Sequence, residues 1–192
     1  MKLYLLLIAF FLPYFSSAQN KIASVEFPNT IRIEKDEASF SGAGIRKRLW
    51  VDVYAIALFH NESTNNPYKV IQSEKPMGVK IHVLARFLTR TKYVTALKEG
   101  FIKSTGNNTK PIKTKIDHFF SILDENFTYG DVCEILYHPD TGVKVYTNDK
   151  LKGVIKGVEF KEALYGIWLK HPSVDQKLAK KMLGKNVPYV SN

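Results

Sequence analysis

A long run of strand-forming residues, Leu49 to His60, is the feature that most restricts how this chain can fold. Aromatic and β-branched residues dominate it, which favours an extended backbone. Side chains alternate between the two faces of a strand, and from Tyr54 onward the residues on both faces are mainly apolar. A strand of this kind must be covered on both sides, so we predict a central strand of a large sheet.

Shorter strands and four helices are predicted around this run from period-two and helical spacing of apolar residues. The predicted strands are 21–27, 30–34, 77–86, 131–137, 143–147 and 150–155, and the predicted helices are 89–104, 114–126, 158–169 and 174–183. This order of elements predicts an α+β fold, an antiparallel sheet with helices packed on one face.

The first residues have the pattern of a secretory signal peptide. Lys2 precedes an apolar run from Leu3 to Phe15, and the small residues Ser16, Ser17 and Ala18 follow. The run is too short to cross a bilayer as a helix. We therefore predict a signal peptide at 1–18, one domain at 19–192, and an exported protein that is periplasmic or secreted.

Charge and cysteine content narrow the function classes. The formal net charge of +10 is compatible with nucleic acid, an anionic membrane surface or anionic ligands, and export argues against nucleic acid. No later apolar run reaches the length of a membrane span. The one cysteine, Cys133, lies in an apolar strand and is expected to be a packed thiol. The histidines have no metal-ligand spacing, so no metal ion is expected. No cofactor is expected either, and the protein is expected to be a monomer.

The candidate site begins at Gly42-Ala43-Gly44-Ile45-Arg46, directly before the long strand. The glycines permit a tight bend or a bulge, which would re-aim the residues that follow. An arginine at the mouth of an apolar cleft is a good carboxylate receptor, because its planar fork binds two oxygens at once. An Arg46 paired with a nearby Asp or Glu is the equally weighted alternative.

This element, followed by Val53 to Phe59, resembles the chalcone isomerase family, and in particular its secreted bacterial branch. Further motifs agree in order, among them Gly130-Asp131, Asn148 before Gly153, and Ala163 to Leu169 before His171-Pro172-Ser173. The resemblance implies the chalcone isomerase fold, an open-faced β-sandwich with a large antiparallel sheet, a layer of helices, and a ligand cleft between them.

The resemblance also implies roles for particular residues. Arg46 matches the family arginine that faces the ligand, and Tyr93 matches the cleft tyrosine on the first helix of the family. Tyr54 stands where the isomerases have a threonine that orders a water, Gly100 where they have an asparagine, and Ile167 where a serine or threonine contacts the substrate. The predicted ligand-binding set is therefore Arg46, Tyr54, Ile56, Tyr93, Leu97, Gly100, Phe101 and Ile167.

Three functions follow. Loss of polar contacts with retention of the arginine favours a non-catalytic binder of a fatty acid or another amphipathic or aromatic carboxylate. An isomerase (an intramolecular lyase) of unknown substrate, with Tyr54 or Tyr93 as catalytic acid, is the first alternative. A structural or interaction protein of the cell envelope is the second.

Overall fold

The computed structural model describes residues 20–184, so the predicted signal peptide at 1–18 lies outside the described residues. An antiparallel sheet of seven strands in the order β11-β10-β9-β6-β5-β4-β3 forms the centre of the fold. Its strands are β3 (Thr30–Ile33), β4 (Asp36–Arg48), β5 (Val51–His60), β6 (Met77–Val83), β9 (Val132–His138), β10 (Gly142–Thr147) and β11 (Lys150–Ile155). Two small two-stranded sheets accompany it, β1 (Asn20–Ile22) with β2 (Val25–Phe27), and β7 (Phe87–Thr89) with β8 (Asn126–Thr128).

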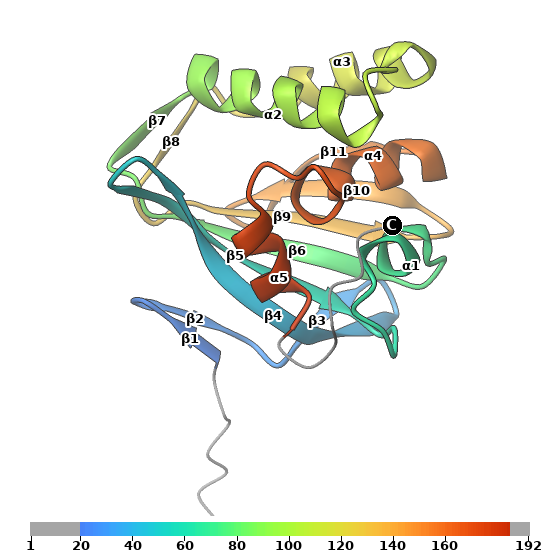
Figure 1. The fold of residues 1–192 in the computed structure, drawn as a ribbon, viewed down its shortest axis with the longest axis horizontal. Coiled ribbons are helices and arrows are strands. Elements are labelled where there is room, and N and C mark those ends of the chain that lie inside the picture. Colours follow the sequence, from blue (N-terminus) through green and yellow to red (C-terminus); the bar gives the residue numbers. More distant parts are fainter. Residues whose placement is uncertain (1–19, 185–192) are drawn as a thin grey trace, which may run out of the picture.

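Helices cover one face of the sheet in two tiers (Figure 1). They are α1 (Pro67–Gln72), α2 (Arg90–Ser104), α3 (Lys113–Ser121), which a short 3₁₀ turn at Lys110–Ile112 precedes, α4 (Val158–Leu169) and α5 (Gln176–Met182). Helix α4 lies on the sheet, where the Tyr165 hydroxyl donates to the carbonyls of Met77 and Ile135 at 3.1 and 2.9 Å. Helices α2 and α3 lie beyond α4. The α+β class, the antiparallel sheet and the helical layer are as predicted.

The central strand β5 is buried on both faces, as its sequence predicts. Ile56 and Leu58 belong to the core between the sheet and the helices. Ala55, Ala57 and Phe59 belong to a second core on the outer face. The two cores confirm the predicted alternation of side chains.

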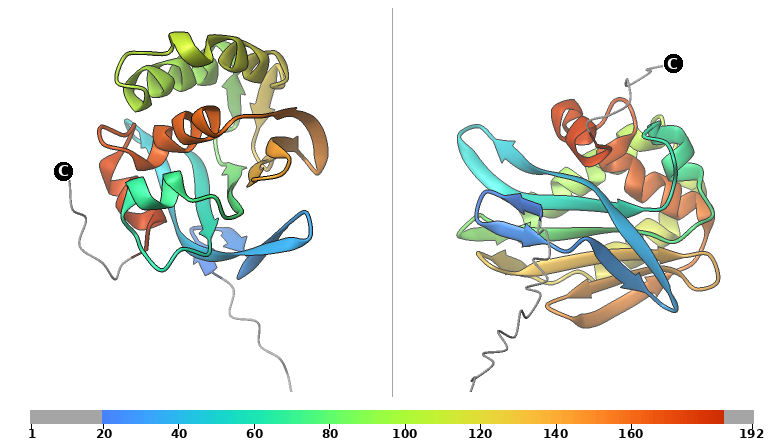
Figure 2. Two further views of the ribbon diagram at one scale, coloured as in Figure 1. Left: turned by 90° about the vertical axis from the view of Figure 1, so that its right-hand side faces the viewer. Right: turned by 90° about the horizontal axis from the view of Figure 1, so that it is seen from below.

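The outer core is covered by the first strands of the chain. Strand β4 has a register irregularity between Phe40 and Gly42, and beyond it β3 and the start of β4 cross the outer face (Figure 2). Phe27 packs edge-on against His82, with 5.2 Å between the ring centroids. The N-terminal strands therefore close one side of the sheet that would otherwise expose apolar residues.

Two differences from the local predictions concern α1 and the start of β5. Helix α1 falls in a segment with loop signals, and Asn66 caps it by accepting from the amides of Tyr68 and Lys69. The predicted strand at Leu49 begins two residues later, because Leu49 and Trp50 form the turn between β4 and β5.

Among residues 20–184, no helix is long and apolar enough to cross a membrane.

Candidate functional site

The Gly-Ala-Gly-Ile-Arg segment lies in β4 and faces helix α5. Gly42, Gly44 and Arg46 pair with Leu58, Ile56 and Tyr54 of β5, whose side chains lie on the helix-covered face. A Cβ at Gly42 would overlap the carbonyl oxygen of Lys181, and one at Gly44 would come within 2.8 Å of the Leu178 side chain. The glycines therefore allow α5 to pack directly on the strand.

Arg46 forms an ion pair with the residue that caps the same helix. Its Nη1 lies 3.0 Å from Oδ2 of Asp175, and the other carboxylate oxygen of Asp175 accepts from the amide of Leu178 at 3.0 Å. Both side chains are about one-quarter exposed, at 28% and 24%. The structure thus shows the alternative in which Arg46 is paired with a nearby acidic residue. The guanidinium has further N–H donors that this one contact does not use.

Tyr54 lies across the strand pair from Arg46, with its hydroxyl held by a tryptophan. Trp168 Nε1 donates to the Tyr54 hydroxyl at 2.9 Å. Burial raises the pKa of Tyr54, the neighbouring Arg46 charge lowers it, and Asp175 raises it. Because an indole N–H only donates, the phenol proton of Tyr54 remains available for an acceptor. Arg46 and Tyr54 are thus cross-strand neighbours at the edge of the helix-side core, and each carries a hydrogen-bond donor; we call them the Arg46–Tyr54 donor pair.

Tyr93 is engaged elsewhere. Its hydroxyl donates to the carbonyl of Asp124, and its ring lies 5.0 Å from the ring of Phe127. Burial is the largest cause of its raised pKa. The neighbouring Arg90 donates to the carbonyls of Leu123 and Asp124, at 2.6 and 3.1 Å. Tyr93 and Arg90 therefore fasten α2 to the segment that follows α3.

The predicted apolar lining is divided between packed core and half-buried surface. Ile56, Phe101 and Ile167 are at most 2% exposed, and Phe101 contacts three other phenylalanine rings. Leu97 is partly buried against the same core. A Cβ at Gly100 would lie 2.6 Å from Ile167, so this glycine allows α2 to approach α4. An alkyl chain that entered between these residues would have to displace packed side chains.

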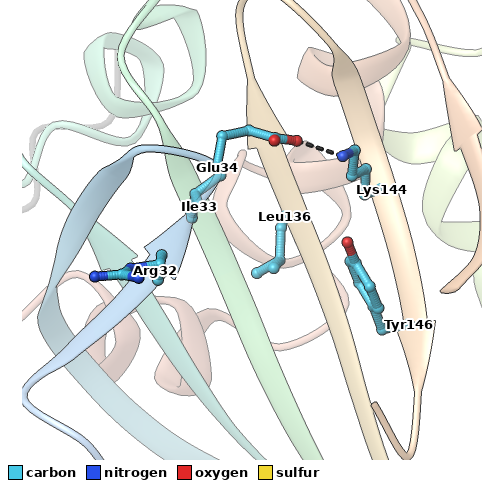
Figure 3. A pocket seen from close by; sticks show the side chains of 6 residues that line it. All are labelled: Arg32, Ile33, Glu34, Leu136, Lys144 and Tyr146. Carbon is cyan, nitrogen blue, oxygen red and sulfur yellow. Dashed lines mark ion pairs between the residues drawn. The ribbon is translucent and has the colours of Figure 1, made fainter. Parts of the chain in front are cut away.

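A pocket of about 350 Å³ lies on the opposite side of the sheet, between β3 and the strands β9 and β10 (Figure 3). Its lining contains none of the predicted ligand residues and consists of Arg32, Ile33, Glu34, Leu136, Lys144 and Tyr146. Lys144 forms an ion pair with Glu34, and this contact lowers the pKa of Glu34 and raises that of Lys144. Its two central charges therefore neutralise each other.

Cys133 is a strand thiol, as predicted. It is buried, and burial raises its pKa to about 12, which keeps it protonated and unreactive.

Three contributors to these contacts were not found from the sequence. Asp175 and Trp168 are far from Arg46 and Tyr54 along the chain, and Arg90 shows no local pattern that separates it from a surface cation. Only the spatial pairing of the elements identifies them.

The large antiparallel sheet with a layer of helices on one face is the architecture of the chalcone isomerase fold. The family model described as chalcone isomerase-like matches residues 19–184, and the chain belongs to this family. A fatty-acid binding protein from Arabidopsis thaliana has the same fold, with a TM-score of 0.67 and 13% sequence identity over 83% of this chain and 92% of that chain. No curated protein matches the sequence.

Proposed function

We propose that the protein is an exported, non-catalytic binder of a fatty acid or a similar amphipathic carboxylate. The observation that carries this proposal is the Arg46–Tyr54 donor pair, which lies at the edge of the helix-side apolar core. A carboxylate needs charge-assisted donors at its head and apolar contact along its chain. The fatty-acid binding protein with the same fold supports this ligand class.

The head group would be held by Arg46 and Tyr54. One carboxylate oxygen would accept from a guanidinium N–H that Asp175 does not use, and the other from the Tyr54 hydroxyl. The chain would then run along the half-buried apolar residues of the same cluster, which include Val94, Leu97 and Val174. In this arrangement Tyr93 positions α2 and does not contact the carboxylate.

Replacement of Arg46 by alanine is expected to weaken fatty-acid binding about 30-fold, because a charge-assisted hydrogen bond contributes about 2 kcal/mol. The loss would be measured by displacement of a fluorescent fatty acid, with native mass spectrometry to detect ligand that co-purifies. Lys47→Ala is the matched control, since Lys47 is the next residue and its ion pair with Asp52 is exposed.

The Asp175→Asn variant distinguishes a ligand-binding role of Arg46 from a purely structural role. Asparagine still caps α5, while the ion pair with Arg46 is lost. Binding should therefore strengthen in Asp175→Asn and weaken in Arg46→Ala. Equal affinity in both variants, or no fatty-acid binding by the wild-type protein, would refute the proposed function.

An isomerase is the second candidate, and Tyr54 is the observation that favours it. A phenol that burial keeps protonated can donate to an oxygen on which charge develops. Turnover of a chalcone that is abolished in Tyr54→Phe would establish this alternative. If neither turnover nor a bound ligand is found, the remaining candidate is a structural or interaction protein of the cell envelope.

Export predicts a defined mature mass. When the full chain is produced in a bacterial host, we expect the mature protein to begin at Gln19 and to appear outside the cytoplasm. Intact-mass spectrometry of the fractionated cells measures this. An uncleaved chain that stays in the cytoplasm would contradict the proposed signal peptide.

A further inference from the structure

The turn between β4 and β5 carries the two most exposed large apolar side chains of residues 20–184. Trp50 is 96% exposed and Leu49 is 87% exposed, and Val51 follows them. Leu49 has a φ of 55°, a left-handed conformation in which glycine or asparagine is usual. Neither packing nor turn geometry explains a leucine and a tryptophan here.

Two neighbouring loops bring further exposed aromatic rings to the same end of the sheet. The amides of Leu84 and Ala85 donate to the carbonyl of Val53 at 3.0 and 3.1 Å, which places the β6–β7 link beside the hairpin. The amide of Gly130 donates to the carbonyl of Val83 at 3.0 Å. Exposed Phe87 begins β7 and exposed Tyr129 directly follows β8. The ends of β7 and β8 lie at the end of the molecule where the β4–β5 hairpin turns (Figure 1).

Cations surround these apolar side chains. Arg48 and Arg86 are exposed, and neither has an ion-pair partner among residues 20–184. Lys47 is also exposed and pairs with Asp52 at 2.7 Å. With a formal charge of +10, the chain as a whole is attracted to negative surfaces.

We propose that this end of the sheet, the Trp50 tip, docks on an anionic lipid bilayer. The Trp50 tip is defined by Leu49, Trp50 and Val51, with Phe87, Tyr129, Arg48 and Arg86 around them. Tryptophan and tyrosine favour the headgroup level of a bilayer, leucine and phenylalanine enter the acyl boundary, and arginine contacts lipid phosphates.

A bilayer fits this surface better than a protein partner does. At the centre of the Trp50 tip is a two-residue hairpin turn between Arg48 and Val51, and this hairpin projects from the sheet as a narrow convex end (Figure 2). A stable protein interface buries about 800 Å² on each partner and is closely fitted, whereas insertion into lipid needs only a few apolar anchors beside positive charge. Arg46 and Tyr54 pair with each other in the same β4–β5 hairpin, a few residues from its turn. Docking of the Trp50 tip would therefore bring the proposed ligand site near the lipid.

Vesicle binding by the ligand-free protein tests this proposal separately from the proposed fatty-acid function. We expect the protein to sediment with vesicles of phosphatidylcholine and phosphatidylglycerol in equal parts, and far less with phosphatidylcholine alone. The chain has two tryptophans, and Trp168 is only 3% exposed, so a blue shift of the emission on vesicles reports Trp50.

Variants assign the binding to the tip. Leu49→Ser with Trp50→Ser should reduce vesicle affinity at least tenfold, and loss of either Arg48 or Arg86 should reduce it about fivefold. Ile102→Ser, at an exposed position of α2, is the control and should bind as the wild type does. Equal binding to both vesicles, unchanged binding of the Leu49/Trp50 variant, or a concentration-dependent blue shift without lipid, which would indicate a protein contact, would overturn the proposal.

Discussion

Lys161→Ala should lower the free energy of unfolding by about 3 kcal/mol, one of the two largest effects expected in this chain. Lys161 lies in the first turn of α4 and is fully buried. Its Nζ donates to the carbonyls of Ile71 and Ser73, at 2.5 and 2.8 Å, and lies 4.7 Å from the centroid of the Tyr137 ring. Alanine would leave both carbonyls without their donor and would open a cavity under α1.

Lys161→Met is the matched variant, because methionine retains most of the apolar stem and removes only the charge and the donors. We expect it to cost less than alanine, since the cavity is filled and the buried charge is gone. Urea unfolding followed by circular dichroism measures both variants. A loss below about 1 kcal/mol in Lys161→Ala would show that the two carbonyls find other donors.

Comparison of the wild type with Lys161→Met also predicts how the stability due to Lys161 depends on pH. Desolvation is the largest influence on Lys161 and lowers its pKa in the folded state from the usual 10.5. Between the lowered pKa and 10.5, the unfolded chain binds this proton and the folded chain does not, so stability due to this group rises with pH. The stability difference between the wild type and Lys161→Met should therefore shift toward the wild type as the pH rises from the lowered pKa of Lys161 toward 10.5.

The elements with a strong local signal were predicted well from the sequence. Helix α4 occupies 158–169, the predicted bounds, because its apolar residues repeat at helical spacing up to Leu169. Helix α2 ends at Ser104, the predicted end, and the Thr89 hydroxyl caps its start by accepting from the amide of Lys92. Helix α1 was missed because six residues carry too little periodicity, and Pro67 and Asn66 also occur in loops.

The geometry of the candidate site depends on a bulge that no local pattern specifies. Continued from the pairs Arg48–Val51 and Lys47–Asp52, a regular hairpin would place Arg46 opposite Val53. The register shifts between Arg46 and Lys47, so Arg46 pairs with Tyr54 instead. The sequence argument anticipated a bulge at Gly42 to Gly44, and the structure has irregularities on either side of that range. The Arg46–Tyr54 pairing could therefore be found only in the structure.

The partners of the site residues are also set by tertiary packing. Asp175 is 129 residues from Arg46, and Trp168 is 114 residues from Tyr54. The family resemblance placed Tyr93 in the ligand cleft, and that placement stays a prediction, while the structure bonds the Tyr93 hydroxyl to the carbonyl of Asp124. Sequence patterns report which face a residue occupies, but not which distant element covers that face.

Gly42→Ala should destabilise the fold by about 3 kcal/mol, the other large effect, because its Cβ would meet main-chain atoms that cannot move independently. The carbonyl oxygens of Lys181 and Met182, at the end of α5, occupy the space that a Cβ would need. Relief of the overlap requires α5 to move away from β4. That movement would also separate Asp175, the cap of α5, from Arg46.

Gly44→Ala is the control that tests this reasoning, because the two glycines face the same helix. The atom nearest to a Cβ at Gly44 is the terminal Cδ1 of Leu178, at 2.8 Å, and a side-chain end can rotate out of the way. We therefore expect Gly44→Ala to cost clearly less than Gly42→Ala in thermal and urea unfolding. Equal losses would mean that α5 moves as easily as a leucine rotamer and that its backbone does not define the spacing to β4. The expected ordering would show that glycine at position 42 seats α5 on the strand and thereby fixes Asp175 beside Arg46.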